Sequence, residues 1–208
     1  MNNIVIHNLS PEEAVNNLTD KYISVGLHPW HIKTNWQEQF YLTEQCASQE
    51  RVLMIGEAGL DKVCRTGFTL QQEIFRRQAL LAETVRKPLI IHCVKAMQEV
   101  LAFHKEIHPS SPWIIHGFHG KPEQAREFLL HGFYLSFGEK FNQESLIITP
   151  LERLCTETDE SSIPIESIYW KIAKTKNISI EELQRKANRV IEVVNRETDF
   201  TYIDIHTH

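Results

Sequence analysis

The feature that most constrains the fold is the regular alternation of short apolar runs with amphipathic stretches. Eight apolar runs are expected to be strands, at about 3–7, 22–28, 52–57, 88–93, 113–118, 133–138, 151–159 and 202–208. Stretches with helical spacing lie between them, at about 11–18, 37–49, 70–86, 96–107, 122–130, 165–175 and 179–194. Strands that are apolar on both faces and alternate with helices indicate a parallel sheet covered by helices.

Eight such units predict a closed (β/α)8 TIM barrel, with an open doubly wound sheet as the alternative. The 208 residues are near the short limit for a barrel and sufficient for one domain with a sizeable core. No low-complexity segment or linker divides the chain, so residues 1–208 are expected to form a single domain. No Gly-x-Gly-x-x-Gly motif follows a strand, which disfavours the dinucleotide-binding form of the open sheet.

Composition restricts the partners and the compartment. Because non-specific nucleic-acid binding depends mainly on basic surface, a net charge of −5 disfavours a protein that coats nucleic acid, but not one that acts on it locally. No run is long enough to span a bilayer and the start lacks signal-peptide features, so we expect a cytoplasmic protein without a membrane partner. The widely spaced Cys46, Cys64, Cys93 and Cys155 argue against a disulfide framework or a zinc ribbon.

The last predicted strand carries Asp204, His206 and His208 at alternate positions. Side chains two residues apart on a strand point to the same face, so the two imidazoles are expected roughly 6–7 Å apart and able to reach one metal ion. A truncated purification tag is the alternative. The β-forming run that leads into the histidines disfavours it.

Polar residues also end several of the other predicted strands. In a barrel the carboxyl ends of the strands converge at one rim, where active sites are built. Each residue alone has a structural explanation as a helix cap or a satisfied histidine, but their shared placement predicts one site. A mixture of imidazole and carboxylate ligands suits Zn²⁺, Mn²⁺ or Fe²⁺, with Mg²⁺ as a further candidate. The predicted ligands at this rim are Glu57, His92, His116, Asp159, His206 and His208.

Several segments carry more specific information: GLHPW within 24–30, IGEAGLD at 55–61, glutamines within 71–82, IIH within 88–92, HGFHG at 116–120 and ETD at 157–159. In this order and spacing they resemble the TatD family of metal-dependent deoxyribonucleases, over nearly the whole chain. The resemblance implies a TIM-barrel hydrolase that cleaves phosphodiester bonds of DNA with two divalent metal ions, Zn, Mg or Mn. DNA is then the expected substrate, and no stable protein partner is predicted.

Carried over by position, the resemblance assigns roles to individual residues. The family's Asp-x-His-x-His is matched by Asp204, His206 and His208, and Glu57 would bridge the ions. Asp159 would share in binding one ion and orient or deprotonate the attacking water. The further histidine ligands would be His92 and His116. His28, in Gly-Leu-His-Pro, would face the substrate phosphate.

The order of the motifs departs from the family pattern. The family opens with Asp-x-His-x-His on its first strand, whereas here that motif follows all the others. Since the first and last strands of a closed barrel are neighbours, a circular permutation would preserve every strand contact, and we predict one; rearranged numbering would produce the same order. A smaller departure is Lys95, near the place where the family often has arginine, and we expect it to contact the substrate phosphate as a point charge.

Two alternative functions remain open on the sequence. One is a hydrolase of the same superfamily that acts on a small ester, lactone, amide or phosphotriester. Many of these use a carboxylated lysine as the bridge, so Glu57 at that position favours the nuclease. The other is a catalytically silent binding protein, if the displaced strand fails to deliver its ligands.

Overall fold

The computed structural model describes residues 3–187 and 202–207 of the chain. Within these ranges, eight strands alternate with eight α-helices and one 3-10 helix. The chain forms two compact units: His7–Trp113, and residues 1–6 together with 114–208. The single domain predicted from the sequence stays a prediction.

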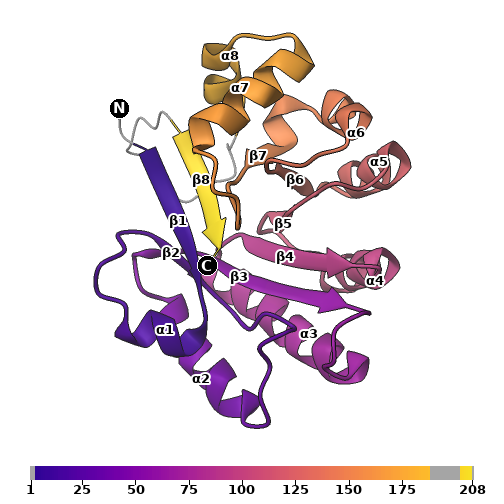
Figure 1. The fold of residues 1–208 in the computed structure, drawn as a ribbon. Helices are drawn as coiled ribbons and strands as arrows, with labels where there is room; N and C mark the ends of the chain where they lie inside the picture. The colour runs from indigo at the N-terminus through magenta and orange to yellow at the C-terminus, as the bar shows by residue number, and fades with distance from the viewer. Residues whose placement is uncertain (1–2, 188–201, 208) are drawn as a thin grey trace. The chain divides into compact units, whose positions relative to one another are not determined.

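The unit His7–Trp113 has four parallel strands in the order β4-β3-β2-β1, of which β1 begins in the other unit (Figure 1). The strands are β1 (Asn3–Leu9), β2 (Ile23–Val25), β3 (Val52–Asp61) and β4 (Leu89–Val94). Their connections contain the helices α1 (Pro11–Asn16), α2 (Trp36–Ala47), α3 (Phe68–Val85) and α4 (Met97–Ile107). Every predicted strand and helix of this region is therefore confirmed, with boundaries shifted by a few residues.

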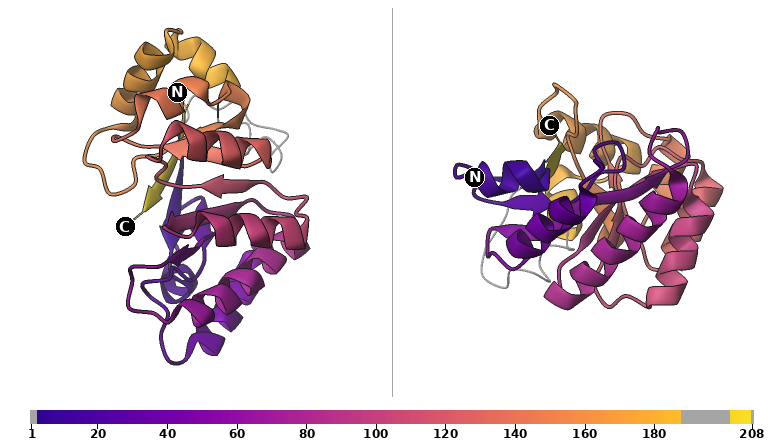
Figure 2. Two further views of the ribbon diagram at one scale, coloured as in Figure 1. Left: turned by 90° about the vertical axis from the view of Figure 1, so that its right-hand side faces the viewer. Right: turned by 90° about the horizontal axis from the view of Figure 1, so that it is seen from below.

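Local sequence explains where the helices of this unit begin and which face they bury. At α1, Ser10 and Glu13 form a reciprocal capping box and Pro11 occupies the first turn, as the sequence predicts. On α3, Ile74, Phe75 and Ala82 are buried at helical spacing. Figure 2 shows α2 and α3 on the same side of the strands, and both contact β3.

Strand β3 corrects one prediction, because it does not end at Glu57 but continues to Asp61. The pairing of β3 with β4 shifts register between Ile55 and Ala58, which leaves Gly56 and Glu57 in an irregularity within the strand. Such a bulge bends a strand and turns a side chain toward a new direction, often beside an active site. Gly56 suits this place: its φ is +136°, and an added Cβ would lie 2.6 Å from the carbonyl oxygen of Ile90.

Gly59 lies against β4 even more closely, and this predicts a large effect on stability. A Cβ at Gly59 would lie 2.2 Å from the carbonyl oxygen of His92. We expect Gly59→Ala to lower the free energy of unfolding by about 1–3 kcal/mol, the usual cost of overpacking. The matched control is Gly67→Ala, because a Cβ at Gly67 meets nothing within 4 Å. Urea unfolding of both variants measures the difference, and equal stabilities would contradict the close approach.

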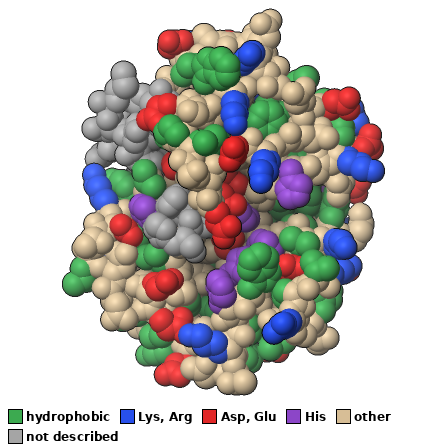
Figure 3. Space-filling model, viewed as in Figure 1, with side chains coloured by type: hydrophobic (Ala, Val, Ile, Leu, Met, Phe, Trp, Pro, Cys, Tyr) green, Lys and Arg blue, Asp and Glu red, His purple; other side chains and the backbone are tan. Residues whose placement is uncertain are grey.

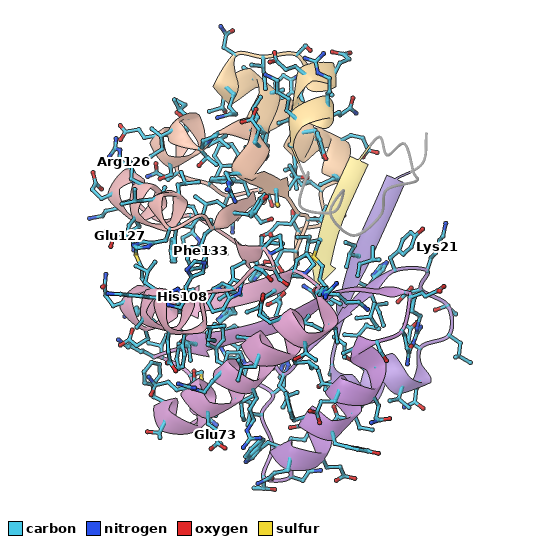
Figure 4. All side chains as sticks on the ribbon, turned by 180° about the vertical axis from the view of Figure 1, so that it is seen from behind. Lys21, Glu73, His108, Arg126, Glu127 and Phe133 are labelled. Carbon is cyan, nitrogen blue, oxygen red and sulfur yellow. The ribbon has the colours of Figure 1, made fainter. Side chains whose placement is uncertain are left out.

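The second unit contains β5 (Trp113–Ile115, from Ile114), β6 (Tyr134–Phe137), β7 (Leu154–Thr156) and β8 (Tyr202–Thr207). Strands β5, β6 and β7 pair in parallel, and a parallel bridge joins Glu157, just after β7, to Ile205 of β8. The helices are α5 (Pro122–Leu130), α6 (Gln143–Ile148), α7 (Ile165–Lys176) and α8 (Ile180–Lys186). On α5, Pro122, Ala125 and Phe128 are buried, whereas Arg126 and Glu127 project from the outer side of the helix (Figure 4).

Two details of this unit differ from the sequence prediction. Residues Leu151–Arg153 form a 3-10 helix instead of the start of a strand, since Pro150 cannot donate to a strand ladder and the turn closes on its carbonyl. Helix α6 was not predicted; Asn142 caps it by accepting a hydrogen bond from the backbone N–H of Ser145. The expected continuation of α8 to residue 194 lies outside the described residues from 188 onward.

Strand β8 is the neighbour of β1 in the sheet, as the permuted order of the motifs requires (Figure 1). The permutation itself stays a prediction, and the expected proximity of His208 to the first residues falls on positions outside the described ones. The four cysteines are free thiols, as expected. Among the described residues, no helix combines the length and apolar character needed to cross a membrane.

Candidate metal centre

In the unit His7–Trp113, three predicted site residues come together. Ligand atoms of His28, Glu57 and His92 all lie within 4.8 Å of one another. Nε2 of His28 lies 3.6 Å from Oε2 of Glu57, and the ring centroids of His28 and His92 are 4.4 Å apart. Glu57 is 7% exposed. On the face of the molecule drawn in Figure 3, some histidine side chains reach the surface next to hydrophobic side chains. The arrangement presents one carboxylate and two imidazoles to a common point.

Two buried glutamines of α3 form hydrogen bonds with the backbone next to His28 and at Asp61. Oε1 of Gln78 accepts the N–H of Leu27 (2.7 Å) and its Nε2 donates to the carbonyl of Leu27 (3.1 Å), immediately before His28. Gln71 makes the same pair of bonds to the N–H and carbonyl of Asp61, at 2.7 and 3.0 Å. The glutamines therefore satisfy backbone groups at Leu27, just beyond β2, and at Asp61, the last residue of β3.

Glu57 is oriented by a residue that the sequence did not single out. Nδ2 of Asn8, on β1, donates to Oε1 of Glu57 at 2.7 Å. Oδ1 of Asn8 in turn accepts from the hydroxyl of Ser24 on β2. A donor on one oxygen fixes the carboxylate and leaves Oε2 facing His28.

The hydrogen bond from Trp30 decides how His28 acts. The backbone N–H of Trp30 donates to Nδ1 of His28 at 3.2 Å, so Nδ1 is an acceptor and carries no proton. In neutral imidazole the proton is then on Nε2, which makes this atom a donor directed at Glu57. A ring with an N–H at Nε2 does not coordinate a metal through that atom. In this arrangement His28 suits a phosphate oxygen, the role expected from the sequence, better than a metal ion.

Asp61 and His92 form a carboxylate–histidine pair. Oδ2 of Asp61 lies 3.4 Å from Nε2 of His92 and accepts Nε1–H of Trp30 at 2.6 Å, while Oδ1 accepts the N–H of Val63 at 2.8 Å. Burial opposes ionisation of Asp61, but these hydrogen bonds and His92 outweigh it and lower the pKa of the carboxyl group. The carboxylate therefore remains charged at neutral pH and orients the imidazole.

The second unit has a similar pair at His116. Oε1 of Glu157 lies 3.5 Å from Nδ1 of His116 and accepts the backbone N–H of Gly117 at 2.6 Å. Glu157 is 1% exposed, and its Oε2 has no hydrogen-bond partner among the described residues. A buried carboxylate beside an imidazole keeps the opposite ring nitrogen available as a ligand and increases its basicity.

Asp159 follows this pair and has a strained backbone, with a φ of +49°. Burial raises the pKa of its carboxyl group; His116 lowers the pKa, whereas Glu157 and Glu160 raise it further. The segment is tied to β8, because both carboxylate oxygens of Asp204 accept hydrogen bonds from Thr158, the backbone N–H at 2.6 Å. Asp204 thus connects the Glu-Thr-Asp segment to the strand that carries His206.

The remaining predicted site residues are placed only in part. The backbone of His206 lies in β8, but its side chain and the whole of His208 are outside the described residues. Lys95 is exposed directly after β4, with a φ of +53°. Asp61 and Glu157 lie in the GLD and ETD segments of the motifs, so the sequence did contain a signal for both carboxylates. Neither was assigned a role from the sequence. Asn8 has no sequence signal, because only strand pairing brings it to Glu57.

The donor set fits a divalent cation. The described residues offer buried carboxylates and imidazoles, of which Glu57 accepts a hydrogen bond from Asn8 and His92 lies within hydrogen-bond distance of Asp61. Such mixed nitrogen and oxygen sets bind Zn²⁺ or Mn²⁺.

Comparison with known proteins identifies the family. The family model described as TatD related DNase matches residues 6–195. The chain belongs to this family. The uncharacterized metal-dependent hydrolase YabD of Bacillus subtilis is 35% identical over 147 residues, which cover 66% of this chain and 58% of YabD. The 3'-5' ssDNA/RNA exonuclease TatD of Cronobacter turicensis is 30% identical over 170 residues, covering 74% and 62%. The chain thus spans about three-fifths of the length of these TatD relatives.

Solved structures of TatD proteins share the fold. The crystal structure of YJJV, a TATD homolog from Escherichia coli K12, aligns with a TM-score of 0.80 at 17% identity and covers 94% of this chain and 87% of that one. A TatD-family hydrolase from Entamoeba histolytica aligns with a TM-score of 0.73 at 19% identity, covering 94% and 85%. Together with the alternating strands and helices, this confirms the predicted (β/α)8 TIM barrel.

Proposed function

We propose that this TatD-family protein is a metal-dependent phosphodiesterase that cleaves DNA. The observation that carries the proposal is the buried Glu57 carboxylate, oriented by Asn8 and with a ligand atom within 4.8 Å of one of His92, in a chain whose named relatives include metal-dependent hydrolases and nucleases. Two divalent ions, Zn, Mg or Mn, are proposed as cofactors. Their proposed ligands are Glu57, His92, His116, Asp159, His206 and His208.

The proposed site residues would have separate roles in metal binding, proton transfer and substrate binding. Bound divalent ions would supply Lewis-acid chemistry, activating water and neutralising charge at phosphorus. Glu57 would bridge the ions, and Asp159, whose raised pKa favours proton uptake, would orient or deprotonate the attacking water. His28 would donate its Nε2–H to a phosphate oxygen, and Lys95 would add a positive charge. Asp61 and Glu157 would keep the histidine ligands in position.

A substrate panel tests the proposal. The full-length protein, loaded with Mg²⁺, Mn²⁺ or Zn²⁺, is offered single-stranded DNA, RNA, and chromogenic carboxylic and phosphate esters. We expect metal-dependent cleavage of DNA that EDTA abolishes. Cleavage of carboxylic esters or phosphotriesters alone would indicate the small-molecule hydrolase. Absence of metal binding by calorimetry, together with absence of any turnover, would refute the proposal and leave a binding protein.

DNA is the proposed substrate because relatives are named as nucleases acting on single-stranded DNA and on RNA. We also propose a cytoplasmic location and no stable protein partner.

A further inference from the structure

Trp30 is an exposed aromatic side chain held rigidly beside the site. It is 57% exposed, and its Nε1–H donates to Oδ2 of Asp61 at 2.6 Å. Its ring meets the imidazoles of His28 and His92 edge-on, with centroid distances of 5.0 and 5.5 Å. Single exposed apolar residues are common on proteins, but here a hydrogen bond and two ring contacts to candidate site residues hold the indole in place.

The surroundings of Trp30 are fixed as well. The carbonyl of Pro29 accepts the hydroxyl of Thr66 at 2.7 Å, which ties the Trp30 turn to the loop after β3. Val63 in that loop is 62% exposed, and its N–H donates to the same Asp61 carboxylate that holds Trp30. Because the indole has already lost its rotational freedom, a ligand that covers it need not supply the cost of ordering it.

Building on the phosphodiesterase activity proposed above, we infer that the exposed face of Trp30 stacks on a nucleobase adjacent to the bond that is cleaved. Stacking on an aromatic face accepts any base and requires that the base has left its own stack. The same backbone turn makes Nε2 of His28 a donor for the phosphate, so the neighbouring residues serve the base and the phosphate of one strand. In a protein of net charge −5, such a contact compensates for weak electrostatic attraction to nucleic acid.

A purely structural role for Trp30, as the donor that holds Asp61, makes a different prediction. Phenylalanine retains an aromatic face but has no N–H, whereas alanine lacks both. If the N–H to Asp61 is what matters, Trp30→Phe and Trp30→Ala will be equally impaired. If stacking matters, Trp30→Phe will retain most of the affinity.

The test measures binding to full-length protein in EDTA, where no turnover occurs. The first probe is a short single-stranded oligonucleotide that contains 2-aminopurine, whose fluorescence falls when the base stacks. The comparison probe is a fluorescein-labelled strand of the same length whose residues are abasic. We expect Trp30→Ala to raise the Kd for the base-containing strand about 5- to 150-fold and to leave the Kd for the abasic strand unchanged. The matched control is Trp170→Ala, since Trp170 on α7 is 54% exposed but packs against Lys174.

The outcomes separate this inference from the proposed function. An equal loss for both strands, no loss for either, or no binding of the base-containing strand by the wild-type protein overturns the stacking role. Cleavage by metal-loaded wild-type protein is measured separately. If the wild-type protein cleaves DNA but Trp30→Ala leaves the Kd for the base-containing strand unchanged, only the stacking inference is rejected. If the base stacks on Trp30 but no cleavage occurs, the phosphodiesterase activity is rejected.

Discussion

Glu57→Gln protein is expected to fold like the wild type and to lose more than about 100-fold of its metal-dependent activity, above the 10–100-fold typical of residues that only support a ligand. The amide has nearly the same shape, so the bond from Nδ2 of Asn8 to the side-chain oxygen is retained. The negative charge, however, is lost from a group with a ligand atom within 4.8 Å of one of His92, a proposed metal ligand. Turnover of DNA and calorimetric titration with Mn²⁺ measure the two consequences.

The matched control for this variant is Glu83→Gln. Glu83 on α3 is also a hydrogen-bonded carboxylate, which accepts from the backbone N–H groups of Ser110 and Ser111 at 2.8 Å. It should change stability at most, without any effect on metal affinity. Unaltered Mn²⁺ binding by well-folded Glu57→Gln protein would remove the carboxylate from the ligand set.

Glu157→Gln is expected to weaken metal binding without lowering the free energy of unfolding. The substitution removes a buried charge, one oxygen of which has no hydrogen-bond partner among the described residues, so the free energy of unfolding should stay equal or rise. His116 loses the carboxylate 3.5 Å from Nδ1, and metal affinity or activity should fall by about 10–100-fold. Thermal unfolding in EDTA and Mn²⁺ titration test the two effects independently.

Glu160→Gln is the control that distinguishes the direct contact of Glu157 with His116 from a general effect of negative charge near the site. Glu160 is exposed and, like Glu157, raises the pKa of Asp159 by its negative charge. If Glu157 acts by orienting His116, only Glu157→Gln will lower metal affinity. An equal decrease in both variants, or a large loss of stability in Glu157→Gln, would show that general charge or structure accounts for the effect.

Periodicity predicted the fold well where the strands are apolar on both faces. In β4, for example, the consecutive aliphatic residues Leu89, Ile90 and Ile91 are all fully buried, as expected in the interior of a covered parallel sheet. Prediction failed at Leu151–Arg153 and at α6, where proline and a capping asparagine determine the local backbone against a weak apolar pattern. It also ended β3 too early, because the irregularity at Gly56 interrupts the pairing without ending the strand.

The residues missed at the site share a cause. Asn8 reaches Glu57 from a strand 49 positions earlier in the chain, and nothing in its own neighbourhood marks it. The role of Glu157 depends on the ring of His116, about 40 residues away. Hydrogen bonds between side chains on separate strands follow from register, which periodicity does not specify.

By itself, the sequence determined the class of fold and the chemical kind of the site residues, since apolar spacing governs burial and the motifs carry the imidazoles and carboxylates. Only the tertiary structure decided how these groups act. Strand register and the bulge at Gly56 bring Asn8 to Glu57, and the turn at Trp30 makes His28 a donor. The physical reason is that protonation and orientation are set by hydrogen-bond partners distant in sequence, whose positions exist only once the strands have paired.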